Sequence, residues 1–454
     1  MPDTLDTAPV SVPVPTEQRL AGLLAGAPAD QAELVRIDTT RRLTRFAENI
    51  VHQNVSIEDR TIYARCVVGK QVGVASTSEL TPEAIRRALE LAASIARTLP
   101  ADLDFPGLPP ADLEAAPASS GFDPETAACD ADIRSDGSSI IAAAATGEGA
   151  EAAGIFETGS EAVYVANSNG VVREGRVTTA ELAATIALAD GRSGWAQAVA
   201  REVGDIDPHQ VARLALSKAV VLSEAPERLA SGAYTVLLEP AAVGQLLLFL
   251  GFMGFGARTV AQQRSFLKAG EKICGENITV REAPFAPGLF GLPIDYEGSV
   301  RRPVALIERG VATEPVSNHY HAAVTGGRST GHALPPDNSY GPYPKHLILE
   351  TGQASRSEML KGIDRGILIT HFWYVNFLNP MRTMVTGTTR DGTFLIEKGE
   401  LAGRLADMRM EQSILEALSS VRMVENDATL YRQYSVMMKI PALLIDGFNL
   451  VQEG

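Results

Sequence analysis

The chain has 454 residues, of which 45% are hydrophobic and 21% are charged, the balance of a soluble globular protein with enough apolar residues for a core. Lys and Arg total 40 and Asp and Glu total 55, so the formal net charge is −15. This charge disfavours nucleic-acid binding, which depends on Lys and Arg displacing counterions from phosphates. Cys66, Cys129 and Cys274 are too far apart for a zinc ribbon, a Cys-x-x-Cys pair or a disulfide scaffold, and they indicate a reduced, cytoplasmic location.

The first residues of the chain are expected to be disordered. Residues 1–30 contain five prolines and lack both the basic and the apolar segment of a secretory signal, so we interpret them as a floppy tail. Apolar and polar residues then alternate over residues 62–75, on either side of Gly69 and Lys70. This alternation predicts a β-hairpin.

A helix is expected after this hairpin. Thr81 is a typical N-cap, and Pro82 suits the first helical position because its missing N–H would be unpaired there in any case. Together with the hairpin, this helix makes an N-terminal α/β domain over residues 31–99. Residues 100–124 contain six prolines, too many for regular structure, and we interpret them as a linker.

The middle of the chain, residues 125–228, is predicted to form a second domain. Small residues over 138–145 indicate a helix. Asn169 and Gly170 predict a tight hairpin turn, because both residues tolerate a positive φ. Asp207 then precedes a proline at the start of another helix.

Residues 229–454 are predicted to form a C-terminal domain rich in strands. Strands over 386–390 and 393–397, separated by Asp391 and Gly392, are typical of a hairpin. Successive hairpins imply an antiparallel sheet that suits a barrel or a sandwich. The predicted fold class is therefore α+β, with an N-terminal α/β domain, a middle domain and a C-terminal domain dominated by antiparallel β-hairpins.

One segment raises the question of a membrane. Residues 241–257 carry no charge, but they include a glutamine and four glycines. The segment is also shorter than the ~20 residues that a bilayer span requires. We therefore predict a buried helix and no membrane partner.

Metal chemistry is first sought at histidines, since imidazole nitrogens and a carboxylate base are the usual residues of a zinc site. The chain has seven histidines and none is followed by Glu, so a His-Glu-x-x-His motif is absent. His319 and His321 would share one face of a strand and could chelate a metal, with His332 or His371 as a third ligand. The competing interpretation is that they are ordinary loop histidines.

Two nucleophile candidates lack the sequence context of a catalytic site. Ser329 and His332 are close in sequence, but they form no Gly-x-Ser-x-Gly turn. Cys274 has no histidine nearby. We predict that Cys274 is a buried or inert thiol.

Four segments resemble one family of proteins. Residues 43–54, 166–171, 329–333 and 386–397 are similar, in order and spacing, to segments of the TldD/PmbA family. The resemblance implies an N-terminal α/β domain, a middle portion and a C-terminal domain of largely antiparallel strands. In this family, TldD-like chains are zinc peptidases with a His-Glu-x-x-x-His motif and a distal cysteine ligand. TldE/PmbA-like chains are their non-catalytic partners in a heterodimer.

The motif window resembles that of the second branch. Pro240 and Gln245 occupy the positions of the two histidine ligands, Ala241 replaces the general base, and no cysteine follows Cys274. The resemblance implies that this chain has no catalytic residue, metal or cofactor of its own. Zinc is expected in a TldD-like partner.

We therefore expect the non-catalytic subunit of a TldD/TldE-type zinc peptidase that degrades or matures unfolded peptides. His371, Trp373, Tyr374 and Arg390 are candidate peptide-binding residues, because aromatic side chains offer large contact areas with a polar tip. Strand-rich domains can also bind a peptide along an open sheet edge. The competing interpretation places Trp373 and Phe372 in the core.

Two alternatives remain open from the sequence. The chain would be an autonomous metal-dependent hydrolase if His319 and His321 formed a site. It would be a homo-oligomeric peptide-binding protein if it had no peptidase partner. The sequence does not distinguish a heterodimer from a homodimer.

Overall fold

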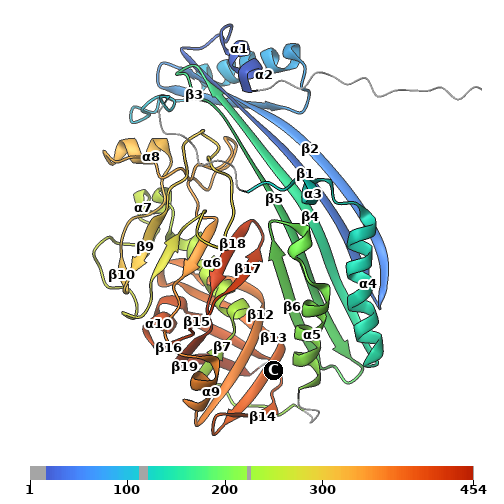
Figure 1. Cartoon of the computed structure of the whole chain (residues 1–454). Coiled ribbons are helices and arrows are strands. Elements are labelled where there is room, and N and C mark those ends of the chain that lie inside the picture. The colour runs from blue at the N-terminus through green and yellow to red at the C-terminus, as the bar shows by residue number, and fades with distance from the viewer. Residues whose placement is uncertain (1–16, 112–120, 222–225, 453–454) are drawn as a thin grey trace, which may run out of the picture.

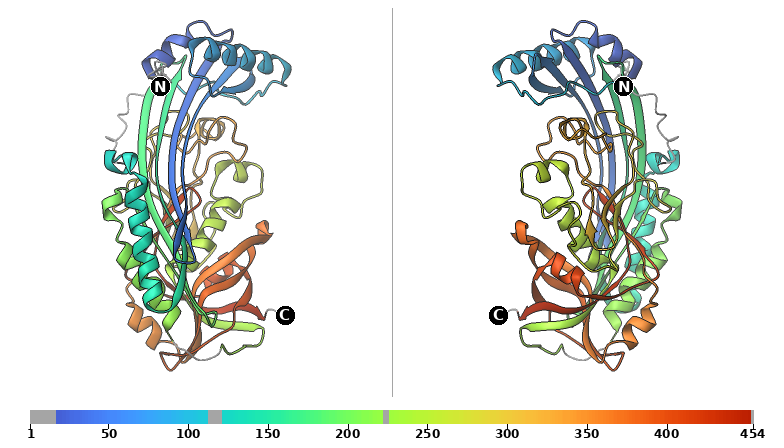
Figure 2. Two further views of the ribbon diagram at one scale, coloured as in Figure 1. Left: turned by 90° about the vertical axis from the view of Figure 1, so that its right-hand side faces the viewer. Right: turned by 90° about the vertical axis from the view of Figure 1, so that its left-hand side faces the viewer.

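The computed structural model of the protein describes residues 17–111, 121–221 and 226–452. Its strands form three mainly antiparallel sheets, which agrees with the predicted α+β class. A long sheet arches along one side of the molecule (Figures 1 and 2). Helices α4 (Ala131–Gly147) and α5 (Pro208–Val220) cover its outer face, and the C-terminal elements face its inner side.

The long sheet has six strands in the order β3-β2-β1-β4-β5-β6. Two predicted hairpins are confirmed: β2 and β3 turn at Gly69 (φ +61°), and β4 and β5 turn at Gly170 (φ +92°). The strands are β1 (Gln31–Ala47), β2 (Ile50–Val68), β3 (Gln71–Thr77), β4 (Ala150–Asn167), β5 (Val172–Leu188) and β6 (Ser193–Ala200).

The helices of this part begin at the predicted capping residues. The Thr81 side chain accepts a hydrogen bond from the Ala84 N–H (3.3 Å) at the start of α2 (Pro82–Thr98). Asp207 likewise caps α5 by accepting from the His209 N–H (2.9 Å). The remaining helices here are α1 (Glu17–Leu24), α3 (Pro124–Ala128) and the 3-10 helix η1 (Val203–Asp205).

The folded units differ from the expected domain boundaries. Residues 17–24 form α1 and Leu20 is fully buried, so the expected tail does not extend to residue 30; residues 1–16 lie outside the described part. Strand β1 pairs with β4, so the segments expected as separate domains over 31–99 and 125–228 share one sheet. Local periodicity could not reveal this pairing, because the two strands lie on opposite sides of the proline-rich segment.

The C-terminal part contains the other two sheets. One has the order β10-β9-β8-β11-β18-β17. Its strands are β8 (Val280–Glu282), β9 (Val304–Glu308), β10 (Val311–Ala312), β11 (His346–Leu349), β17 (Thr429–Gln433) and β18 (Val436–Ile440).

The third sheet is barrel-like, because β12, β7, β19, β15 and β13 pair in turn and β13 pairs back with β12. Strands β14 and β16 join it at its sides. Its strands are β7 (Gly232–Leu238), β12 (Arg365–Asn379), β13 (Met384–Glu397), β14 (Glu400–Arg404), β15 (Met408–Ser413), β16 (Val421–Val424) and β19 (Leu443–Gln452).

The expected hairpin turn at Asp391 and Gly392 is wrong. Strand β13 runs through both residues, which form a bulge opposite Thr370 with φ values of +58° and +137°. The chain reverses instead at η2 (Pro380–Arg382), and Thr383 (φ +50°) follows it. A glycine after an acidic residue suits a bulge as well as a turn, so the dipeptide alone does not distinguish them.

The uncharged segment of the sequence forms the central helix α6 (Pro240–Gly254), as predicted. Most of its residues are buried, and it contacts β12 of the barrel and β17 and β18 of the neighbouring sheet. Within the described ranges, no helix is long and apolar enough to cross a membrane. The other C-terminal helices are short: α7 (Ala257–Ala261), α8 (His319–Val324), α9 (Arg356–Lys361) and α10 (Ile414–Ser419).

A buried ionic latch joins the long sheet to the C-terminal part. Glu33 of β1 lies 2.7 Å from the Arg65 Nη2 of β2, and the Arg65 Nη1 lies 3.4 Å from Glu297, in the loop between β8 and β9. Beside it, Ile294 and Tyr296 of the same loop pack against valines of the long sheet. The two parts of the chain therefore meet through both charged and apolar contacts.

Candidate functional site

A cavity of about 780 Å³ lies where the long sheet meets the C-terminal part. Its walls come from β1, β4, β5 and β6 of the long sheet, from α6, from β12 and from the β17–β18 hairpin. Because these elements are far apart in the sequence, only the folded chain brings them together.

Several residues singled out from the sequence line this cavity. Gln245 of the motif window reaches it from α6, and His371, Trp373 and Tyr374 reach it from β12. The guanidinium of Arg390 lies 4.5 Å from the centre of the Trp373 ring. The structure thus brings Gln245, His371, Trp373 and Tyr374 to one cavity, with Arg390 beside Trp373, and the binding of a peptide there stays a prediction.

His371 lies at the centre of a hydrogen-bonded and stacked group. Its ring stacks on Trp195, with 4.7 Å between the centroids and 6° between the planes. Its Nδ1 is 3.5 Å from Asp391 Oδ2, and Ser193 donates to Asp391 Oδ1 at 2.9 Å. Burial would raise the pKa of Asp391, but the interactions with His371 and Ser193 outweigh it and lower that pKa.

Gln245 completes this group from the helix. Its Nε2 lies 3.3 Å from His371 Nε2. With the amide nitrogen donating, His371 Nε2 is the acceptor, and the other ring nitrogen, Nδ1, faces Asp391. The Gln245 side chain of the motif window is therefore a hydrogen-bond donor to a histidine.

Charged side chains on the cavity wall balance one another. Arg41 lies 2.5 Å from Glu157, and Arg432 of β17 pairs with Glu181 of β5. The Gln197 side-chain amide makes two hydrogen bonds to the backbone of Arg432. It donates to the Arg432 C=O (2.9 Å) and accepts from the Arg432 N–H (3.0 Å). The two arginines and two glutamates leave the wall without net charge. A ligand in the cavity would therefore be contacted mainly by aromatic rings and by the side-chain amides of glutamines.

The residues of the motif window do not fit zinc. Pro240 and Ala241 lie in the first turn of α6 and have no side-chain donor atom, and the Gln245 amide is engaged with His371. Cys274 lies elsewhere, 4% exposed. Across residues 17–111, 121–221 and 226–452, no group of three His, Cys, Asp or Glu side chains is arranged to hold a metal.

The expectation that His319 and His321 share one face of a strand is wrong. These residues begin the helix α8, and on a helix residues i and i+2 point to different faces. The His321 Nδ1 is engaged with Asn318, the N-cap, at 2.7 Å. Both ring nitrogens of His332 are engaged elsewhere: Nε2 lies 3.2 Å from Glu282 Oε1, and Nδ1 lies 2.9 Å from Thr330 Oγ1.

Sequence reasoning missed a buried cluster and part of the cavity wall. Glu282 contacts both His332 and His346, and interactions with these histidines outweigh burial and hold the pKa of Glu282 far below its usual value. The cavity residue Trp195 was also missed, as was Ser193, which donates to Asp391 beside His371. No local pattern marks any of these residues, because they meet only through pairing between distant strands.

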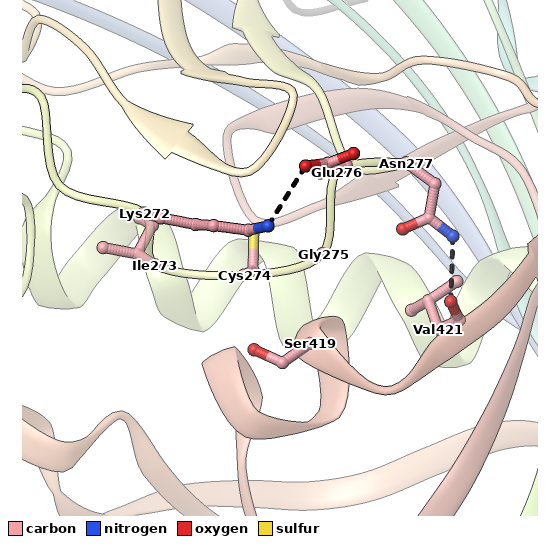
Figure 3. Close-up of a pocket in the computed structure, with 8 residues that line it drawn as sticks. All are labelled: Lys272, Ile273, Cys274, Gly275, Glu276, Asn277, Ser419 and Val421. Atoms are coloured by element: carbon pink, nitrogen blue, oxygen red, sulfur yellow. Dashed lines mark hydrogen bonds and ion pairs between the residues drawn. The ribbon is translucent and has the colours of Figure 1, made fainter.

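A second cavity surrounds Cys274, as Figure 3 shows. Lys272 and Glu276 pair with each other at 3.3 Å, and the Asn277 amide donates to the Val421 C=O at 2.8 Å (Figure 3). Burial raises the pKa of the Cys274 thiol to about 12. The thiol is therefore buried and protonated, as expected for an inert cysteine.

The sequence matches two domains of a known family. These are PmbA/TldA metallopeptidase domain 1, over residues 32–96, and the PmbA/TldA metallopeptidase C-terminal domain, over residues 231–452. The chain is 24% identical over 428 residues to metalloprotease PmbA of Escherichia coli O157:H7, which covers 89% of each chain. It is 25% identical over 250 residues to a metalloprotease of Methanothermobacter thermautotrophicus, spanning 52% of this chain and 51% of that protein.

Solved structures share the whole fold. The match to TldE from Thermococcus kodakarensis has a TM-score of 0.85 at 22% identity and covers 95% of this chain and 99% of that one. A Thermotoga maritima protein, provisionally described as a modulator of DNA gyrase, matches with a TM-score of 0.80 at 21% identity and covers 96% and 99%. With the two domain matches, these findings identify the chain as a member of the PmbA/TldD metallopeptidase family.

Proposed function

We propose that this chain is the non-catalytic subunit of a two-chain zinc peptidase that degrades or matures unfolded peptides. A companion subunit of the peptidase branch supplies the zinc, and this chain supplies part of the wall that holds the peptide. The observation that carries the proposal is the side-chain chemistry of the motif window: Pro240 and Ala241 offer no donor, and Gln245 is bonded to His371.

The cavity supports the peptide-holding role. Trp373 and Tyr374 offer apolar area with a polar tip, and the charged wall residues neutralise one another. Such a wall accepts many side chains, as an unfolded peptide of varied sequence requires. A cytoplasmic location is part of the proposal and is supported by the three free, buried cysteines.

The test is cleavage of a fluorogenic unfolded peptide by three samples: this chain alone, a family member with His-Glu-x-x-x-His from the same organism, and the mixture. We expect cleavage by the mixture that EDTA abolishes, and none by this chain alone at any zinc concentration. Zinc-dependent cleavage by this chain alone would refute the proposal. Sedimentation of each sample separates a mixed dimer from a homodimer, the competing assembly.

A further inference from the structure

A surface rich in exposed aromatic side chains adjoins the cavity. It comprises the outer part of the β12–β13 hairpin, residues 373–383, together with Tyr434, and we call it the docking face. The hairpin projects from the side of the molecule in Figure 2. Its large apolar side chains and Tyr434 are 45–79% exposed: Trp373, Tyr374, Phe377, Leu378, Met381 and Tyr434. Such a concentration of exposed apolar groups marks an interaction site.

The backbone holds two of these side chains outward under strain. Tyr374 (φ +52°) and Tyr434 (φ +53°) both lie in the left-handed region, which bulky residues rarely adopt. Tyr374 belongs to a bulge, where β12 loses register with β13 between Trp373 and Asn376. Both tyrosines line the cavity and are more than 70% exposed. Strained residues of this kind persist where a function requires their orientation.

The docking face differs in charge from the rest of the molecule. Arg382 is the only charged residue of the docking face, and Arg390 of β13 lies beside it, whereas the whole chain has a net charge of −15. The Arg390 guanidinium covers one face of the Trp373 ring. A partner surface that complements the docking face would be apolar, with carboxylates at its edge. Two copies that met face to face here would bring these arginines together, which disfavours self-association.

We propose that the docking face binds the peptidase subunit. The partner's surface would be an apolar groove with an acidic rim, and the bound partner would complete the wall of the cavity. This inference rests on the proposed function. A peptide in the cavity does not account for the whole face, because Phe377, Leu378 and Met381 lie outside the cavity lining. Trp373 and Tyr374 belong to both the face and the cavity, so docking there places the partner directly beside it.

The test compares a double variant, Tyr374→Ser with Phe377→Ser, with the control Leu103→Ser. Leu103 is 81% exposed and lies outside the docking face. We expect the double variant to weaken binding of the peptidase subunit at least tenfold, and the control to change it less than twofold. Hydrogen exchange on the wild-type complex should show protection of residues 373–383, and thermal melting checks that each variant is folded.

The outcomes separate this inference from the proposed function. If the wild-type chain binds no peptidase subunit, the proposed function fails. If the complex forms and the double variant binds as tightly as Leu103→Ser, the docking face is wrongly assigned while the proposed function stands. If the double variant unfolds, the variant Arg382→Glu is tested in its place. Weaker binding of the peptidase subunit by Arg382→Glu supports the docking face, and unchanged binding overturns it. A wild-type homodimer that the double variant abolishes would overturn the choice of partner.

Discussion

Replacement of Glu33 by Gln should remove a pH-dependent part of the stability of the latch. Glu33 is completely buried beside Arg65. Burial raises the pKa of Glu33 from 4.5 to about 7, although Arg65 acts in the opposite direction. The folded chain therefore holds this proton more tightly than the unfolded chain. Its protonation stabilises the fold at low pH, and that stabilisation is lost as the pH rises through about 7.

The magnitude follows from the interval between the two pKa values. Each pKa unit corresponds to about 1.4 kcal/mol. Measurement near pH 5.0 is impractical because it is the isoelectric point of the chain. Between pH 5.5 and pH 8, the Glu33 contribution to the free energy of unfolding should fall by about 2 kcal/mol. Glu33→Gln lacks this titratable carboxyl group. The free energy of unfolding of wild type minus that of the variant should therefore fall by about 2 kcal/mol between pH 5.5 and pH 8.

The assay is urea unfolding of both proteins at pH 5.5, 6.5, 7 and 8, followed by circular dichroism. Other groups titrate over the same range: burial lowers the pKa of His332 and His346, which costs stability as the pH falls through about 6.5. These contributions cancel when the variant is subtracted from wild type at each pH. Glu276→Gln, at an exposed carboxylate, is the matched control. A difference between wild type and Glu33→Gln that is the same at pH 5.5 and pH 8 would refute the reasoning.

Three further predictions concern packing and reactivity. Leu248 of α6 is fully buried, so Leu248→Ala should lower the free energy of unfolding by about 2–5 kcal/mol in urea titrations. A loss under 1 kcal/mol would contradict its core position. Gly73→Ala should destabilise the β3–α2 contact by about 3 kcal/mol in the same assay, because its Cβ would lie 2.1 Å from the Ala92 O; unchanged stability would rule out this close packing. Cys274 should react with a thiol reagent at pH 8 far more slowly in the native protein than in urea, and equal rates would show that the thiol is exposed.

Local elements could be predicted from the sequence because their signals are local. A glycine that tolerates a positive φ marks the turn at Gly69, and an N-cap followed by proline marks the start of α2 at Thr81. The pairing of β1 with β4 has no such signal, since it depends on which of many apolar strands lie side by side. The error at Asp391 has a related cause: the dipeptide predicts a local irregularity, and the partner strand decides whether it becomes a turn or a bulge.

The candidate site was predicted only in part, for the same reason. Gln245 followed from the motif window, and His371, Trp373 and Tyr374 from their aromatic and polar character, and the structure brings all four to one cavity. Trp195, which stacks on His371, comes from a strand of the long sheet, and nothing in its sequence context relates it to α6 or β12. Residue type thus indicated the cavity wall formed by α6 and β12. The opposite wall belongs to the long sheet, and its residues reach the cavity only because that sheet packs against the C-terminal part.

Under the proposed function, the position of α6 explains how a metallopeptidase fold persists without metal ligands on this helix. The stability of this helix comes from apolar residues that are buried on nearly all sides, including Leu246, Leu248 and Leu250. The donor positions contribute little to that packing: Pro240 starts the helix, and Ala241 adds one methyl group. Their replacement therefore costs the fold little, whereas replacement of the leucines would create cavities. If the chain is the proposed non-catalytic subunit, its donor positions can change freely as long as the surfaces that would meet peptide and partner are kept. The docking face is therefore the more informative place to test the proposed function.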